Sequence, residues 1–295
     1  MRRTMKKLYV MALAILLPFA ALAEEVDRTL DAASDGTVHI SNISGSVKVD
    51  GWNRDQVNVR GVLGRNVEEL IVDRDGDRIT IKVKVPKKGS RDIKSDLRIS
   101  VPRDSSIDIA TVSADIDVTG VRGYQKLEAV SGDIDTEAFG SDVRAGTVSG
   151  DVEVRGHGED TETHGNSVSG DVVFVTLSGQ ISAESVSGDI EIEGGAFDRA
   201  GFNTVNGDIE FGAELRSGGK LTAETVNGEV DLVFQGTVAG RFDVDTFNGD
   251  IMNCFGPKPE RTSKYAPGQE LSFQEGNGDA RITVSTMNGD VSICR

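Results

Sequence analysis

The sequence predicts an all-β protein: a single-stranded parallel β-solenoid (β-helix) of about ten coils, with 18–21 residues per coil and a less regular N-terminal cap. Three observations support this prediction. A short phrase recurs at a nearly constant interval, and apolar and polar residues alternate between its copies. No copy is joined to the next by a segment that has the pattern of a crossover helix.

The recurring phrase is Val-Ser/Asn-Gly-Asp/Glu-Ile/Val, with Phe or Met in place of the first Val near the end of the chain. A degenerate copy is centred on Ala114, and a distant one is centred on Gly45. From Ala114 to Gly249 the centres are 18–21 residues apart, and the last step, to Gly289, is 40 residues. The regular copies are centred on Gly132, Gly150, Gly170, Gly188, Gly207, Gly228, Gly249 and Gly289.

The segments between copies have the alternation of strands, as in Leu221-Thr-Ala223 and Ile190-Glu-Ile192. Most units contain one odd step of five residues between apolar positions, which cannot keep both side chains on one face of a straight strand. The chain must therefore turn a corner in each unit. Parallel coils about 4.8 Å apart would then stack each residue on its counterpart.

The Ser/Asn-Gly-Asp phrase fits such a corner. Gly tolerates positive φ, and Ser, Asn and Asp can bond to neighbouring backbone groups. We expect the Val and Ile that flank the corner to point inward and stack on their counterparts in adjacent coils.

The chain divides into three parts. Residues 1–23 have a basic start, a short apolar run and small residues before Glu24, which is typical of a cleaved signal peptide. Residues 24–110 are expected to form the N-terminal cap and the first coils. Residues 111–295 form the regular solenoid, with an inserted loop at 255–275. The apolar run is too short to span a membrane, so the mature protein is expected to be exported, soluble, and periplasmic or on the cell surface.

The charge of the chain excludes some partners. The formal net charge is −16, and it becomes −20 without residues 1–23, which carry four basic residues and no acidic ones. Such a surface repels nucleic acid and favours cations and basic partners.

Two cysteines occupy the same place in different units. Cys254 and Cys294 each follow a phrase glycine, Gly249 or Gly289, by five residues. In consecutive coils their Cα atoms would lie about 4.8 Å apart, within the range of a disulfide. An oxidising compartment favours this bond; the alternative is a pair of stacked free thiols.

The serial V-[SN]-G-D-[IV] phrase, the export signal, the stretch GWNRDQVNV and the closing GNGDARITVSTMNGDVSI together resemble the DUF4097 family, over roughly residues 37–295. The resemblance implies a β-solenoid at the cell envelope, of the kind labelled "putative adhesin". It implies no catalytic motif and no established ligand.

The acidic residues of the phrase form the first candidate site. Stacked coils would place them in a column, where they serve as turn residues or bind Ca²⁺ weakly, since Ca²⁺ prefers six to eight oxygen ligands. Two histidines, His157 and His164, share a polar loop with three carboxylates; this loop is either solvated or a metal site. No other cofactor is indicated. The candidate Ca²⁺ ligands are Asp133, Asp151, Asp171, Asp189, Asp208 and Asp250.

Three functions are open. The first is a non-catalytic adhesin-like or scaffold protein that offers an acidic face to an envelope protein or glycan. The second is a carbohydrate-active enzyme, which would need two unlike carboxylates about 5–10 Å apart in a groove. The third is a rod that self-associates through its ends.

Overall fold

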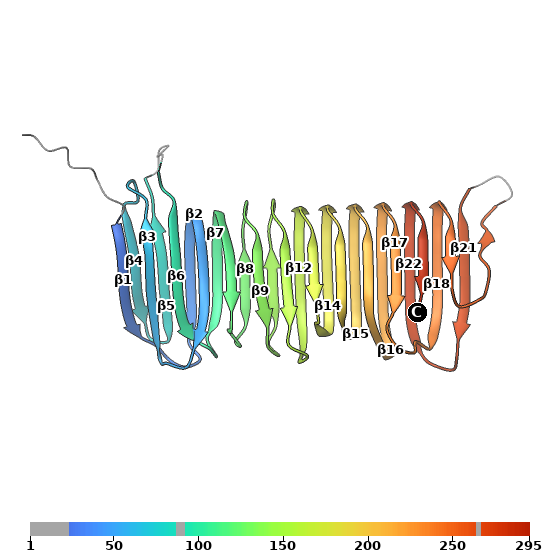
Figure 1. Cartoon of the computed structure of the whole chain (residues 1–295), viewed down its shortest axis with the longest axis horizontal. Coiled ribbons are helices and arrows are strands. Elements are labelled where there is room, and N and C mark those ends of the chain that lie inside the picture. Colours follow the sequence, from blue (N-terminus) through green and yellow to red (C-terminus); the bar gives the residue numbers. More distant parts are fainter. Residues whose placement is uncertain (1–23, 87–91, 264–266) are drawn as a thin grey trace, which may run out of the picture.

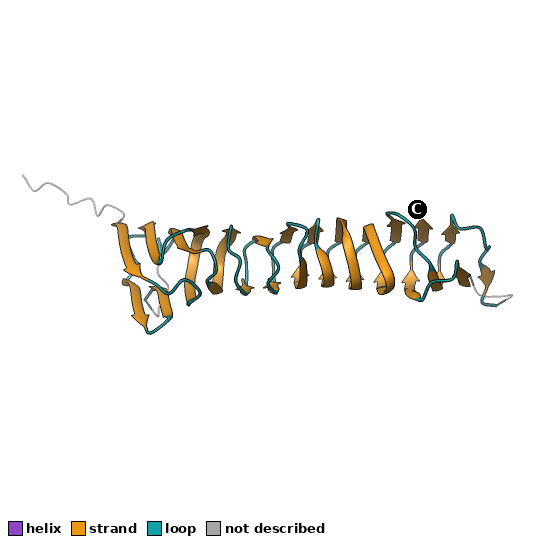
Figure 2. Cartoon of the chain, turned by 90° about the horizontal axis from the view of Figure 1, so that it is seen from below, coloured by secondary structure: helices purple, strands orange, loops and turns teal. Residues whose placement is uncertain are grey.

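The computed structural model describes residues 24–86, 92–263 and 267–295, and these residues form strands and turns without a helix (Figures 1 and 2). The all-β class is therefore confirmed. All strands join one long mixed sheet. Among the described residues no helix has the length and hydropathy needed to cross a bilayer. The predicted signal peptide, residues 1–23, lies outside the described residues.

The strands stack side by side along the long axis of the molecule (Figure 1). We call one strand-turn-strand unit a rung, the strands that lead into the glycine corner row one, and the strands that leave it row two. Row one contains β8 (Gln125–Glu128), β10 (Val143–Gly146), β12 (Asp160–Ser169), β14 (Ser178–Ser187), β18 (Gly240–Asn248) and β22 (Ala280–Asn288). Row two contains β9 (Ile134–Ala138), β11 (Val152–Gly156), β13 (Val172–Val175), β17 (Val230–Phe234), β19 (Ile251–Asn253) and β23 (Val291–Cys294).

Four longer strands contribute to both rows, and seven strands complete the ends. The long strands are β2 (Thr37–Trp52), β7 (Ser106–Thr119), β15 (Ile190–Asn206) and β16 (Ile209–Asn227). The end strands are β1 (Glu24–Asp31), β3 (Gln56–Leu63), β4 (Glu69–Asp75), β5 (Arg78–Lys84), β6 (Ser95–Pro102), β20 (Glu260–Arg261) and β21 (Gln269–Glu275).

Between β7 and β16 the neighbouring rungs pair in parallel and in register. Val152 lies opposite Ile134 on one side and Val172 on the other. Each inward apolar residue thus stacks on an equivalent residue, and a two-residue change in unit length leaves the inside and the outside unchanged.

The strictly parallel arrangement that the period predicts does not extend to the ends. β1 pairs with β3, β3 with β6, and β4 with β5, all antiparallel. At the other end β21 runs antiparallel to β18. For β4 and β5 the physical reason is their two-residue connection, Gly76-Asp77, which can join antiparallel strands but not parallel ones.

The order of the rungs also differs from the order of the sequence. The last rung, β22 and β23, lies between β16–β17 and β18–β19. Likewise β2 lies between β5–β6 on one side and β7 on the other. The period of the repeat does not determine this order, because parallel pairing requires only equivalent edges and gives no preference to sequence neighbours.

The core lies between the two rows. If Gly165 of row one had a Cβ, that atom would lie 2.8 Å from the Phe174 ring of row two. Toward the C-terminal end the core becomes aromatic, with Phe211 centred 6.0 Å from Phe202 and 5.6 Å from Phe234. Because the inward faces of the rows touch, their outward faces point to opposite sides of the molecule (Figure 2).

Candidate functional site

The glycine corners form a continuous ladder, but the reason for glycine differs from the predicted one. Five of the eight phrase glycines do not have positive φ. Instead, each approaches the backbone of the adjacent rung so closely that a side chain would collide with it. A Cβ on Gly207 would lie 2.1 Å from the carbonyl oxygen of Gly188, and one on Gly188 would lie 2.1 Å from that of Gly170.

The corner carboxylates, which are the candidate Ca²⁺ ligands, are engaged by the backbone. The amide of Asp171 donates to Asp151 Oδ1 at 2.9 Å, and the amide of Asp189 donates to Asp171 Oδ1 at 2.8 Å. The same bond recurs from Asp115 to Glu229, with distances of 2.7–3.3 Å. Each Asp therefore ties its rung to the next. Among the described residues no group of three or more His, Cys, Asp or Glu is arranged to hold a metal.

The carboxylate ladder is interrupted at Glu229. Its amide donates to Asp208 Oδ1 at 2.7 Å. The described residues show no bond from the amide of Asp290, in the next rung, to the longer Glu229 side chain. The ladder resumes with Asp250, whose amide donates to Asp290 Oδ1 at 2.8 Å.

A second ladder involves a position that the sequence interpretation did not use, three residues before seven of the eight phrase glycines. There a buried Thr or Ser hydroxyl donates to the glycine carbonyl of the adjacent rung, as Thr204 does to Gly188 at 3.1 Å. The signal was visible in the sequence, because this position is Thr or Ser in the phrases TVSGD, SVSGD and TVNGD. The equivalent residues are Thr147, Ser167, Ser185, Thr204, Thr225, Thr246 and Thr286.

The apolar residue that precedes each Ser/Asn-Gly pair points outward, which corrects the expectation that both flanking residues are inside. Val130 is 48% exposed, whereas Ile134, after the corner, is 1% exposed. In a straight strand Val130 and Ile134, four residues apart, would point to the same face, but the corner places them on opposite faces. The result is an outward apolar stripe, composed of Val112, Val130, Val148, Val168, Val186, Val205, Val226, Met287 and Phe247.

The outward face of row two is acidic along most of its length. Equivalent positions, two residues beyond the corner carboxylates, place acidic side chains on adjacent rungs, with Val173 as an interruption. Neighbouring carboxylates about 4.8 Å apart repel each other by about 0.9 kcal/mol in water. This acidic column consists of Asp117, Asp135, Glu153, Glu191, Glu210 and Asp231.

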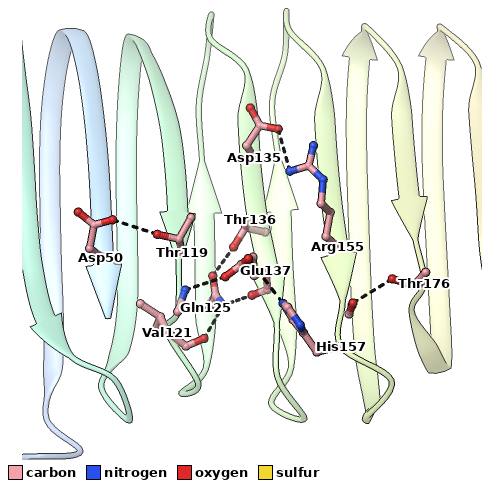
Figure 3. Close-up of polar contacts among 12 residues, drawn as sticks. Asp50, Thr119, Val121, Gln125, Asp135, Thr136, Glu137, Arg155, His157 and Thr176 are labelled. Carbon is pink, nitrogen blue, oxygen red and sulfur yellow. Dashed lines mark hydrogen bonds and ion pairs between the residues drawn. The ribbon is translucent and has the colours of Figure 1, made fainter. Parts of the chain in front are cut away.

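The two ends of the acidic column differ in whether their carboxylates have basic partners. At the N-terminal part, Lys48 lies 2.8 Å from Asp117, and Arg155 pairs with Glu153. Arg155 also lies 3.9 Å from Asp135, as Figure 3 shows. Farther along, the described residues give Glu191, Glu210 and Asp231 no basic partner. These three carboxylates are therefore the least compensated part of the column.

The crowding of these carboxylates affects the pKa of Glu191. Burial raises the pKa of Glu191 above its ordinary value, and the neighbouring carboxylates of Glu193 and Glu210 add to the effect. Glu191, Glu210 and Asp231 line a shallow hollow of about 260 Å³ on the row-two face. The hollow suits a small cationic group better than a neutral one.

One buried polar residue, Gln125, has a structural role. Its amide nitrogen donates to the carbonyl oxygen of Glu137 at 2.6 Å, and its amide oxygen accepts from the Thr136 hydroxyl at 2.6 Å (Figure 3).

His157 lies 3.6 Å from Glu137 and stacks on Phe139 at 4.1 Å. His164 instead bonds to Glu162 at 2.9 Å. The two histidines of the candidate metal loop thus have separate partners.

The two cysteines are joined by a disulfide, and their Cα atoms lie 4.9 Å apart. Cys294 is the last residue of β23, and Cys254 directly follows β19, the strand with which β23 pairs. The bond therefore ties the intercalated last rung to its outer neighbour.

The comparisons with known proteins concern the same repeat. Residues 178–294 match the family model Toastrack DUF4097. The predicted resemblance is confirmed over this Toastrack segment, which contains the uncompensated end of the acidic column. No curated protein matches the chain.

Solved structures are similar to nearly the whole chain at low identity. A "putative adhesin" of Bacteroides fragilis NCTC 9343 is 11% identical with a TM-score of 0.47, over 91% of this chain and 96% of that one. A "putative lipid binding protein" of Parabacteroides distasonis ATCC 8503 is 13% identical with a TM-score of 0.45, also over 91% and 96%. A "putative adhesin" of the same organism is 11% identical with a TM-score of 0.38, over 92% of this chain and 98% of that one.

Proposed function

We propose that this chain is an exported, non-catalytic β-solenoid of about ten coils that binds a basic partner at the cell envelope through the acidic column of row two. The in-register parallel pairing of successive rungs supports the solenoid. The signal-like sequence of residues 1–23 supports export. The names of the similar solved structures, adhesin and lipid-binding protein, are in keeping with an interaction role.

The observation that carries the proposal is the uncompensated end of the acidic column. The corner carboxylates stabilise the fold by accepting backbone amides, so their charge has a structural purpose. Glu191, Glu210 and Asp231 accept no such bond in the described structure. Three like charges on consecutive rungs cost stability unless a cation relieves them. A partner with ammonium or guanidinium groups at a similar spacing would gain affinity from this relief.

The arrangement favours binding over glycoside hydrolysis. A hydrolase needs two carboxylates in unlike environments, one kept protonated as the acid and one ionised. Here the carboxylates repeat one environment on an open outward face. The raised pKa of Glu191 arises from burial and like-charge crowding rather than from a dedicated partner.

The test uses a decalysine peptide as a probe and pull-down from cell envelopes as the physiological measurement. The variant Glu191→Gln/Glu210→Gln/Asp231→Asn should lose about tenfold in affinity for the peptide and should fail to capture the envelope partner. The matched control, Glu184→Gln/Glu224→Gln/Glu270→Gln, removes the same charge from exposed positions elsewhere. Equal binding by both variants would refute the acidic column as the site.

Export has its own measurement. N-terminal sequencing of the protein from an expressing cell should begin at Glu24. A mature chain that still begins at Met1 in the cytoplasmic fraction would refute this part of the proposal.

A further inference from the structure

Row one carries a file of basic side chains, although the net charge of the chain is negative. At the position eight residues before the corner glycine, four adjacent rungs each present an exposed basic side chain. Arg199 pairs in register with Lys220, Lys220 with Arg281, and Arg281 with Arg241. We call these four residues the basic ladder.

Within the described structure, one of the four cations of the basic ladder has an ion-pair partner. Arg241 is held by Asp243, with its Nε 2.8 Å from the carboxylate. Arg199, Lys220 and Arg281 make no ion pair with any other described residue. The first outward position beyond the ladder is acidic on one of the four rungs, where Asp243 lies beside Thr283. Glu224 and Asp245 lie one outward position farther along the strands. Like charges about 4.8 Å apart repel, so the fold carries an electrostatic cost here that an anionic ligand would remove.

The surface beside the ladder is flat and polar. The next outward position toward the corner is Gly201, Thr222 and Thr283 on three consecutive rungs. A Cβ on Gly201 would meet nothing within 4 Å, so this rung leaves room above the sheet. Each rung therefore offers one cation, and two of them add a hydroxyl that can bond to a sugar hydroxyl or a carboxylate.

We propose that the basic ladder binds a linear, carboxylate-bearing polysaccharide, with successive uronate groups lying across successive rungs. The cations repeat every 4.8 Å or so, and an extended polymer with one carboxylate per sugar has a comparable charge spacing. Arg and Lys pair directly with carboxylates, and Arg does so in a bidentate manner. This site lies on the face opposite to the acidic column, and it does not depend on the function proposed for that column.

The geometry favours a single narrow chain over other polyanions. The cations form one file of four, with Asp243 beside its last member and Glu224 and Asp245 farther along the strands. A nucleic-acid duplex or an anionic membrane needs a broad basic surface. The acidic column does not prevent binding of a short chain, because charges beyond about 8 Å are largely screened at physiological salt.

The test measures the affinity of labelled decagalacturonate at low ionic strength, with neutral dextran of similar length as the ligand control. The wild type should bind the uronate, with affinity that falls as salt rises. The variant Lys220→Gln/Arg281→Gln should lose about tenfold in affinity. The control variant Lys126→Gln/Arg144→Gln removes the same charge from row one, where Arg144 is exposed and Lys126 is half-buried and pairs with Glu128. Its affinity should stay within about twofold of the wild type.

Three results would overturn the proposal. The wild type does not bind decagalacturonate, the two variants lose affinity equally, or single-stranded DNA or anionic vesicles bind the wild type more tightly than the uronate does. Since Arg144, Lys220 and Arg281 are exposed and Lys126 is half-buried, circular dichroism should show unchanged folding in both variants.

Discussion

The buried hydroxyl ladder provides the sharpest test of how the rungs are held together. Thr204 is 1% exposed, and its hydroxyl donates to the carbonyl oxygen of Gly188 at 3.1 Å. Among the described residues no other donor bonds to this carbonyl. Thr204→Val keeps the shape of the side chain but removes the donor, so the carbonyl is left unsatisfied at the corner.

The expected cost follows from the loss of a hydrogen bond between the buried Thr204 and the half-buried Gly188. A typical hydrogen bond contributes about 1 kcal/mol net, and an unsatisfied buried group costs about 1–3 kcal/mol. Burial of the new methyl group recovers about 0.8 kcal/mol at most. The free energy of unfolding should therefore fall by about 1–2 kcal/mol.

The assay is urea unfolding followed by circular dichroism. Thr222→Val is the matched control, because Thr222 lies on the adjacent strand, faces outward and makes no hydrogen bond in the described structure. If Thr204→Val and Thr222→Val lower the stability equally, the hydroxyl ladder is not a stabilising element and the reasoning fails.

Three further changes test other parts of the stack. Glu229→Asp should complete the carboxylate ladder toward Asp290 and raise the unfolding free energy by about 0.5–1.5 kcal/mol, and an unchanged midpoint in urea would contradict this. Glu191→Gln should stabilise the protein more at pH 7 than at pH 4. An acid whose folded pKa is raised contributes stability below its unfolded pKa and loses it as pH rises through the folded pKa, so the charged Glu191 destabilises the fold at pH 7. An equal gain in stability at both pH values would refute that cause. Reduction of the Cys254–Cys294 bond, which closes a separation of 40 residues, should cost about 4 kcal/mol, measured against the oxidised protein in urea; no change would mean that the last rung is held by strand pairing alone.

Much of the fold was predictable because each rung repeats the same pattern of alternating apolar residues and a glycine corner. The alternation of Ile190-Glu-Ile192 indicated strands, and the spacing of the glycines indicated stacked units. The spacing of Cys254 and Cys294 from their glycines placed them on paired strands. These are local relations that survive any change in the order of the rungs.

The order of the rungs and the facing of the corner could not be read in the same way. A parallel edge accepts any equivalent strand, so the period does not say that β22 lies between β16 and β18. The outward facing of Val130 depends on how the chain turns at Ser131 and Gly132, and the alternation alone is compatible with either facing. The basic ladder was visible as Arg or Lys eight residues before four of the glycines, but the net charge of the whole chain obscured it.

The end of the stack shows why the period of the sequence repeat does not predict how many rungs stack together. In a regular rung, Val172 donates its amide to the carbonyl oxygen of Asp189, and the Asp189 amide donates to Asp171 Oδ1. At the outermost rung, formed by β18 and β19, the side chain of Gln269 from the antiparallel strand β21 supplies both groups. Its oxygen accepts from the Ile251 amide at 2.9 Å, and its nitrogen donates to Asp250 Oδ1 at 2.5 Å. A single side-chain amide thus replaces the peptide group that another rung would have provided. The corner is satisfied without a further copy of the chain, so this part of the outer edge offers no open bonds to an incoming rod, which argues against end-to-end assembly through the corner.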